Sequence, residues 1–337
     1  MTLLTPSFDS ALLAGNPLGD PATRRVLVCL PPGYEEGDRR YPVVYFLPGF
    51  ASRGVALLND SLWEESLPQR LERLIRTGAV PPMILVSPDC STRLGGSQYV
   101  NSPATGRYED HIVHELVPWV DAQYRTTASR DERAVIGKSS GGYGALMLGM
   151  RHPEVFGLVA DHSGDKYFEL CYRTDFPRCV AGLAPFEHSV AAFLAGFPQP
   201  RHQRGALWFD VVNTLAMASC YSPRAGEPGG FELPFDPYTC ELRPAVWERW
   251  LGADPLHAAE AGAAALRSLR LLYLDCGRRD EHHLHLGGRL FSRRLAALGV
   301  LHAYEEFDGG HFNTAHRYEV SLRAIGAALP NGSRKAT

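Results

Sequence analysis

A serine between glycines lies where two expected elements meet. Residues 137–141 read Gly-Lys-Ser-Ser-Gly, which matches the pattern G-x-S-x-G with Ser139 at its centre. We expect a strand over residues 133–136 and a helix over residues 139–151, so Ser139 would lie in the turn between them. Glycines would let the strand and helix approach closely, and the helix N-terminus would favour negative charge near the hydroxyl. This context predicts a nucleophile rather than an incidental serine in a glycine-rich turn.

A serine hydroxyl is a weak nucleophile and needs a base, usually a histidine held by a carboxylate. The chain has 13 histidines, and His311 is the strongest candidate among them. It ends the segment Phe-Asp-Gly-Gly-His at residues 307–311, which follows an expected strand and precedes an expected helix. His152 and His162 lie near the ends of elements, and we interpret both as structural.

The acidic partner is sought after the expected strand at residues 269–274. Asp280 follows the turn at Gly277, where a loop can carry it towards His311. Asp275 is still within the strand end, and Glu281 is the nearest rival. The resulting chain order is serine, acid and histidine, each placed just after a strand, and this order predicts a catalytic triad.

Two backbone N–H groups are expected to stabilise the oxyanion that forms when the serine attacks. One is the amide of Ser140, the residue after the nucleophile. The other is the amide of Phe50, which follows the expected strand at residues 43–47 and the Pro48-Gly49 pair. The alternative is that Pro48-Gly49 forms only a turn.

Metal and disulfide chemistry are weakly indicated. His282, His283 and His285 lie close together but lack the carboxylate and histidine spacing of a known metal site, so we expect no metal and no other cofactor. Four of the seven cysteines fall in one central segment and leave a disulfide open, although the odd total favours free thiols. These four are Cys171, Cys179, Cys220 and Cys240.

The elements that must position these residues alternate between short apolar strands and helical patterns. This alternation predicts one α/β domain over residues 1–337, with a mostly parallel, doubly wound sheet. The alternation stops over residues 165–250, which we interpret as an inserted lid or cap. Its aromatic side chains, such as Trp208 and Phe209, would line a substrate pocket or form a small core of their own.

Composition excludes several classes of protein. The 337 residues carry a formal charge of −3, which gives no sign of nucleic-acid binding. The longest apolar runs are far shorter than the roughly 20 residues that cross a bilayer. The first 18 residues lack a basic region and a continuous apolar stretch, so we expect no secretory signal and a cytoplasmic location. Whether the chain forms a homo-oligomer stays open.

Several segments together resemble the putative-esterase family of the α/β-hydrolases, which contains S-formylglutathione hydrolases, feruloyl esterases, enterochelin-type esterases and antigen 85 mycolyltransferases. The segments are VLVCLPPGY at 26–34, YPVVYFLPG at 41–49, YVNSPATGRYED at 99–110, ELVPWVDAQYR at 115–125, GKSSGGYGAL at 137–146, DCGRRDE at 275–281 and FDGGHF at 307–312.

The resemblance implies an α/β-hydrolase fold and the same assignment of Ser139, Asp280 and His311, with Phe50 and Ser140 at the oxyanion hole. Many members have His-Gly where this chain has Pro48-Gly49, and residues 166–250 have no clear counterpart in the small members.

These features predict a serine hydrolase that cleaves small carboxylic esters through an acyl-enzyme. An acyltransferase or a thioesterase would use the same three residues. A non-catalytic binding protein on this fold is disfavoured, because every triad position is filled.

Overall fold

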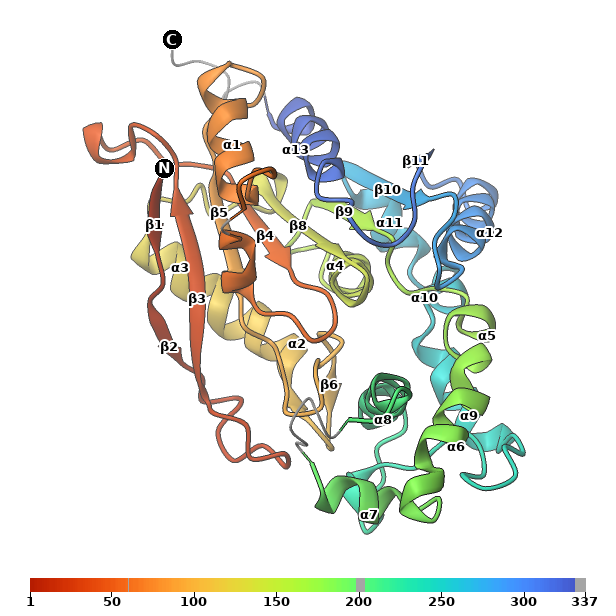
Figure 1. Ribbon diagram of the computed structural model, residues 1–337. Helices are drawn as coiled ribbons and strands as arrows, with labels where there is room; N and C mark the ends of the chain where they lie inside the picture. The colour runs from red at the N-terminus through yellow and green to blue at the C-terminus, as the bar shows by residue number, and fades with distance from the viewer. Residues whose placement is uncertain (60, 198–203, 331–337) are drawn as a thin grey trace.

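A nine-stranded sheet forms the centre of the molecule in the computed structural model, which describes residues 1–59, 61–197 and 204–330 (Figure 1). The strand order is β1-β3-β5-β4-β8-β9-β10-β11, and β2 pairs with β3 outside this path. The strands are β1 (Thr2–Leu4), β2 (Ser7–Asp9), β3 (Thr23–Leu30), β4 (Val43–Leu47), β5 (Ile84–Pro88), β8 (Arg133–Lys138), β9 (Leu158–His162), β10 (Leu271–Gly277) and β11 (Ala303–Phe307).

Six neighbouring strands, β5, β4, β8, β9, β10 and β11, run parallel to one another. At the other side of the sheet, β3 pairs antiparallel with β5, and β1 and β2 pair antiparallel with β3. All residues of β4, β5 and β9 are buried, because helices cover both faces of the sheet. The expected mostly parallel α/β fold is therefore confirmed. Parallel strands bring their carboxyl ends to one edge of the sheet, and the loops after β4, β8, β9, β10 and β11 meet there.

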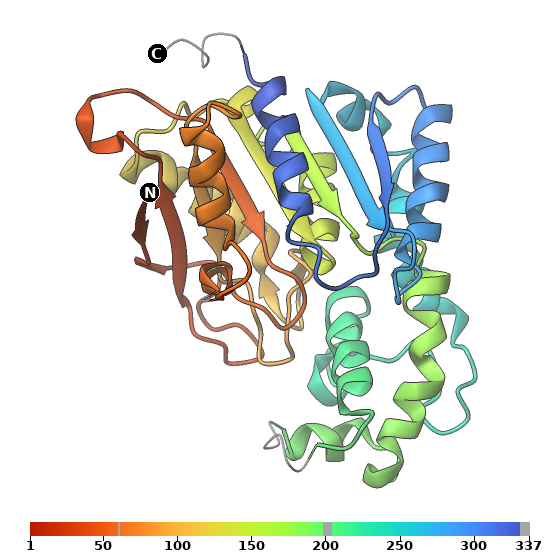
Figure 2. The ribbon, with the colours of Figure 1, turned by 45° about the horizontal axis from the view of Figure 1, so that its top comes forward.

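Helices cover the sheet as two layers (Figure 2). One face carries α1 (Leu67–Arg76) and α13 (Arg317–Ala328), whose apolar residues pack in one cluster with the sheet. The residues of α3 (Val117–Gln123), α4 (Ser140–Arg151) and α12 (Leu284–Ala297) belong to the cluster on the other face.

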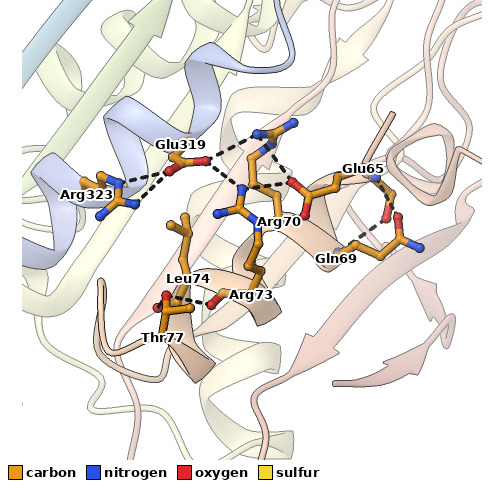
Figure 3. Close-up of polar contacts among 9 residues, drawn as sticks. Glu65, Gln69, Arg70, Arg73, Leu74, Thr77, Glu319 and Arg323 are labelled. Atoms are coloured by element: carbon orange, nitrogen blue, oxygen red, sulfur yellow. Dashed lines mark hydrogen bonds and ion pairs between the residues drawn. The ribbon is translucent and has the colours of Figure 1, made fainter. Parts of the chain in front are cut away.

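A polar network ties α1 to α13 (Figure 3). Glu319 of α13 bonds Arg73 of α1 at 2.7 Å and lies 3.4 Å from Arg70. Arg323, one turn further along α13, also bonds Glu319. These contacts, mainly the bond from Arg73, lower the pKa of Glu319 to about 2.

The segment at residues 165–250 is mostly helical. It contains α5 (Phe168–Cys171), α6 (Phe176–Leu183), α7 (Val190–Ala195), α8 (Trp208–Tyr221) and most of α9 (Pro244–Ala253). These helices lie together beyond the carboxyl ends of the strands (Figures 1 and 2). Phe176 anchors them by packing against Phe235, Trp247 and Trp250. The segment therefore has an aromatic core of its own.

Some helices begin at other residues, or have another geometry, than the sequence predicts. A helix was expected from residue 63, but α1 begins at Leu67, because Ser66 caps it and exchanges bonds with Gln69. The helix expected over residues 111–124 contains a π-helical part, His111–Leu116, before α3. The short edge strands β1 and β2 were not expected.

The described part of the chain contains neither a membrane-spanning helix nor a disulfide. No helix in the described ranges is long and apolar enough to cross a membrane. The seven cysteines, all of which lie in those ranges, are free thiols, so the disulfide left open by the sequence is not formed.

Candidate active site

Ser139 occupies a strained turn between β8 and α4. Its backbone angles are φ 57° and ψ −126°, which a residue with a side chain rarely adopts. Close packing explains the glycines beside it: a Cβ on Gly137 would lie 2.2 Å from the Gly141 carbonyl oxygen, and one on Gly141 would lie 1.9 Å from the Leu47 oxygen. The turn places Ser139 directly before the N-terminus of α4, as the G-x-S-x-G context predicts.

His311 and Asp280 form a buried pair on the loops after β11 and β10. His311 Nδ1 lies 2.8 Å from Asp280 Oδ2, and the side chains are 5 % and 0 % exposed. Asp280 Oδ1 accepts the backbone N–H of His282 at 2.9 Å, which orients the carboxylate. Burial opposes ionisation of Asp280, but the bond to His311 and the backbone donors outweigh it and lower the pKa of the carboxyl.

The two rival acids have other partners. Glu281 Oε2 accepts the backbone N–H of His311 at 2.6 Å, so this residue fixes the loop and not the imidazole ring. Asp275 bonds the ring of His162 at 2.7 Å. Of the three candidates, Asp280 is therefore the one whose carboxylate contacts the His311 ring.

A cavity of about 520 Å³ joins the predicted residues. Its lining includes Ser139, His311, Phe50 and Ser140. No hydrogen bond joins the Ser139 hydroxyl to His311 within the described part of the chain. Such bonds are often long in unliganded enzymes and tighten when substrate binds. The structure thus brings the serine and the histidine to one cavity, with Asp280 behind the histidine.

The loop after β4 lies against the turn that carries Ser139. A Cβ built on Gly49 would lie 3.5 Å from the Ser139 Cβ. The Tyr99 hydroxyl donates to the Pro48 carbonyl at 2.5 Å and holds this loop in place. Among the described residues, the amides of Phe50 and Ser140 have no protein acceptor. Both amides are available as the two expected oxyanion donors.

A lysine and two exposed aromatic rings also line the cavity. Burial lowers the pKa of the Lys138 ammonium, although the charges of Asp280 and Glu281 partly oppose this. Lys138 also lies 5.6 Å above the ring of Phe312. Phe312 and Phe209 are 61 % and 51 % exposed, so large aromatic rings border the opening.

Trp208 and Phe209, for which the sequence left a substrate pocket or a separate core open, occupy different places. Phe209 lines the cavity with Ser139, whereas Trp208 lines a neighbouring cavity of about 480 Å³. Trp208 stacks on Phe197 at 5.6 Å. Phe50 and Phe209 border both cavities and contact each other edge to face.

Metal-binding geometry occurs away from this cavity. Within the described ranges, the one group that could hold an ion is Glu169, Asp254 and His257. Asp254 caps α10 (Pro255–Ala258) and accepts backbone N–H groups, such as that of Phe168 at 2.7 Å, which leaves little capacity for a metal. His282 instead lines the catalytic cavity, with its ring 4.7 Å from that of His311.

Sequence reasoning missed Asp165 and Gln98. Asp165 lines the cavity and accepts a bond from Gln98 at 3.0 Å. A signal was present for Asp165, because it lies three residues after β9, at the same sheet edge as the other loops. Gln98 had no such signal, since it lies in an irregular loop.

Comparison with known proteins identifies the family. The family model described as "putative esterase" matches residues 21–328. The chain belongs to this family. The resemblance seen in the sequence is thereby confirmed.

Relatives that are named esterases match this chain over part of their length. Esterase MT1326 of Mycobacterium tuberculosis is 34 % identical over 158 residues, which are 47 % of this chain and 31 % of that protein. An endo-1,4-beta-xylanase/feruloyl esterase of Xylanibacter ruminicola is 28 % identical over 146 residues, 42 % of this chain and 19 % of that protein. The chain thus spans less than a third of the length of these two relatives.

Solved structures share the fold. A ferulic acid esterase superposes with a TM-score of 0.63 at 21 % identity and covers 98 % of both chains. An S-formylglutathione hydrolase from Staphylococcus aureus has a TM-score of 0.58 at 15 % identity and covers 98 % of this chain and 99 % of its own. At these identities the likeness supports the α/β-hydrolase fold alone.

Proposed function

We propose that this chain is a serine hydrolase that cleaves carboxylic esters through an acyl-enzyme. The observation that carries the proposal is the 2.8 Å bond between His311 Nδ1 and Asp280 Oδ2 at the cavity that contains Ser139. Membership in the esterase family supports the same activity.

In the first step, Ser139 Oγ attacks the ester carbonyl carbon while His311 Nε2 accepts the hydroxyl proton. The carbonyl oxygen becomes an oxyanion, which the amides of Phe50 and Ser140 stabilise. Asp280 holds the tautomer of His311 and stabilises the imidazolium. The C–O bond to the alcohol then breaks, and the imidazolium gives its proton to the leaving alkoxide.

In the second step, His311 takes a proton from water as the water oxygen attacks the acyl carbon. Collapse of this second intermediate releases the acid and returns the proton to Ser139 Oγ. No step needs a redox or metal cofactor. Transfer of the acyl group to an alcohol, and cleavage of a thioester, would use the same groups and stay alternatives.

We also propose that residues 165–250 act as a cap that selects the substrate. Support comes from Asp165, Tyr172, Phe209 and Asn213, which line the cavity from this segment. The cytoplasmic location expected from the sequence stays a prediction, and the oligomeric state stays open.

Replacement of the nucleophile tests the activity. Ser139→Ala should lower kcat for a p-nitrophenyl ester by about 10⁶, because the covalent route is lost. Ser321→Ala is the matched control: Ser321 is a fully buried serine of α13 and does not line the cavity. Wild-type turnover by Ser139→Ala would refute the proposal.

A further inference from the structure

Asp165 is a buried carboxylate in the catalytic cavity that the proposed mechanism does not use. It is 7 % exposed and belongs to the cavity lining together with Ser139. A carboxylate removed from water is costly unless a partner satisfies it. The hydrogen-bond partners of Asp165 therefore show which of its oxygens could still accept a hydrogen bond from a substrate.

The hydrogen bonds that reach Asp165 from the described residues converge on one oxygen. Oδ2 accepts the Tyr172 hydroxyl at 2.6 Å and the Gln98 amide at 3.0 Å, and Ser140 Oγ lies at 3.4 Å. Within the described ranges, Oδ1 has no hydrogen-bond partner. One side of the carboxylate is fixed by protein, and the other is left with acceptor capacity.

No cation among the described residues forms an ion pair with Asp165. The adjacent Lys166 is 2.8 Å from Asp161 Oδ2 and donates to the Gly164 carbonyl at 2.6 Å. The polar contacts of this lysine thus go to other groups than Asp165. The donors that reach Asp165 from the described residues are all uncharged.

The groups around Asp165 hold it rigidly. Gln98 is fully buried, has a positive φ of 50°, and also bonds the hydroxyls of Tyr172 and Tyr221. The ring of Phe168 packs on both tyrosines at 4.6 and 5.2 Å. Because these side chains are packed, the carboxylate is oriented in advance and loses little entropy when a ligand binds.

We propose that Asp165 Oδ1 accepts a hydrogen bond from a hydroxyl or ammonium group of the ester substrate. This proposal rests on the proposed function and deepens it by naming the substrate class: esters that carry a hydrogen-bond donor away from the reacting carbonyl. An ester that ends in a methyl group leaves Oδ1 desolvated and unpaired. The resulting preference is about 10- to 100-fold in kcat/KM.

Two matched ester series test the preference in the wild-type enzyme. One series consists of ethyl esters of acids that end in hydroxyl, ammonium or methyl, at several chain lengths. The other consists of acetates of alcohols with the same ends, so the two series separate recognition on the acyl side from recognition on the alcohol side. Comparison of hydroxyl with ammonium shows which donor is preferred.

We expect kcat/KM to favour a donor-ended ester over its methyl-ended isostere in one series. In Asp165→Asn this ratio should fall towards one. Asp210→Asn is the matched control, because Asp210 also lies on the helical segment but pairs with Arg178 outside the cavity. The control should keep the wild-type ratio.

A second variant keeps the test informative if Asp165→Asn does not fold. Asp165→Glu moves the acceptor by one methylene, so the preferred donor-ended ester should become shorter by about one carbon. A wild-type ratio near one in both series, or an unchanged ratio in Asp165→Asn, would overturn the proposal. Absence of hydrolysis of every ester would instead refute the proposed function itself.

Discussion

Among the described residues, two aspartate–histidine pairs lie at neighbouring strand ends, and His311 of one pair lines the cavity that contains Ser139. Asp280 bonds His311 at 2.8 Å beside Ser139. Asp275 bonds His162 at 2.7 Å, and the other ring nitrogen of His162 lies 2.9 Å from the Ser321 hydroxyl. The second arrangement therefore has the more complete chain of hydrogen bonds.

The two arrangements differ in how accessible their residues are to solvent and substrate. His162 is 2 % exposed, Ser321 is fully buried, and neither lines the cavity that contains Ser139. Ser321 also donates to the Tyr318 carbonyl and sits within α13, away from any helix N-terminus. Ser139, by contrast, lies on a strained turn next to two amides without acceptors. We therefore propose catalysis at Ser139 and a structural role for Ser321, although the hydrogen bonds of the two arrangements join the same residue types.

Charge compensation also differs between the pairs. Burial opposes ionisation of Asp275, but His162 and Arg317 outweigh it, so its pKa is lowered. Arg317 Nε lies 2.8 Å from Asp275 and places a permanent positive charge there. Asp280 has no arginine partner among the described residues, and its main charged neighbour is His311. The Asp275–His162 pair therefore has a permanent countercharge, whereas in the proposed mechanism the imidazole of the Asp280–His311 pair carries the charge that forms during reaction.

Matched amide substitutions give the largest expected contrast. Asp280→Asn should lower kcat for an activated ester by about 10⁴, because His311 loses the partner that fixes its tautomer. Asp275→Asn should leave kcat of the folded enzyme close to wild type. It should instead lower the free energy of unfolding by about 3–5 kcal/mol, since Arg317 loses its buried partner.

Steady-state kinetics and urea unfolding of both variants measure these effects. The comparison fails if Asp275→Asn reduces kcat as strongly as Asp280→Asn, or if Asp280→Asn keeps wild-type kcat. In either case the two pairs would not have separate roles.

A smaller effect is expected at Glu319, which lies on α13 between Arg317 and Ser321 and joins this helix to α1 (Figure 3). Its pKa is lowered from 4.5 to about 2, so its contribution to stability is present above pH 4.5 and is lost as pH falls towards 2. Glu319→Gln should cost about 0.5–1 kcal/mol at pH 7, because the network is partly exposed. The difference from wild type should shrink below pH 4.

Unfolding by urea between pH 2 and pH 7 measures this difference, with kcat as the control. A stability difference that grows on acidification would contradict the sign. A loss of kcat would show that the contacts of α13 reach the cavity.

Much of the site could be predicted because it depends on local sequence. Ser139 lies in a strand–turn–helix context, and Phe50, Asp280 and His311 each follow an apolar strand whose carboxyl end must reach the same sheet edge. A parallel sheet makes these positions converge, so the chain order alone was informative.

The remaining features depend on register and side-chain packing. The pair of His162 with Asp275 arises because these residues are opposite each other in the parallel ladder of β9 and β10. Local periodicity does not specify which residues face each other across strands. The contact of Gln98 with Asp165 is also non-local. For Trp208 the sequence left a substrate pocket and a separate core both open, and its ring stacks on Phe197. The local pattern of aromatic residues does not distinguish these two roles.

Covalent labelling by a fluorophosphonate tests the central claim most directly. The probe reacts with an activated serine, and peptide mapping by mass spectrometry locates the adduct. We expect one adduct, on the peptide that contains Ser139, and its loss in Ser139→Ala. An adduct on the peptide that contains Ser321, or no adduct on enzyme that hydrolyses esters, would contradict it.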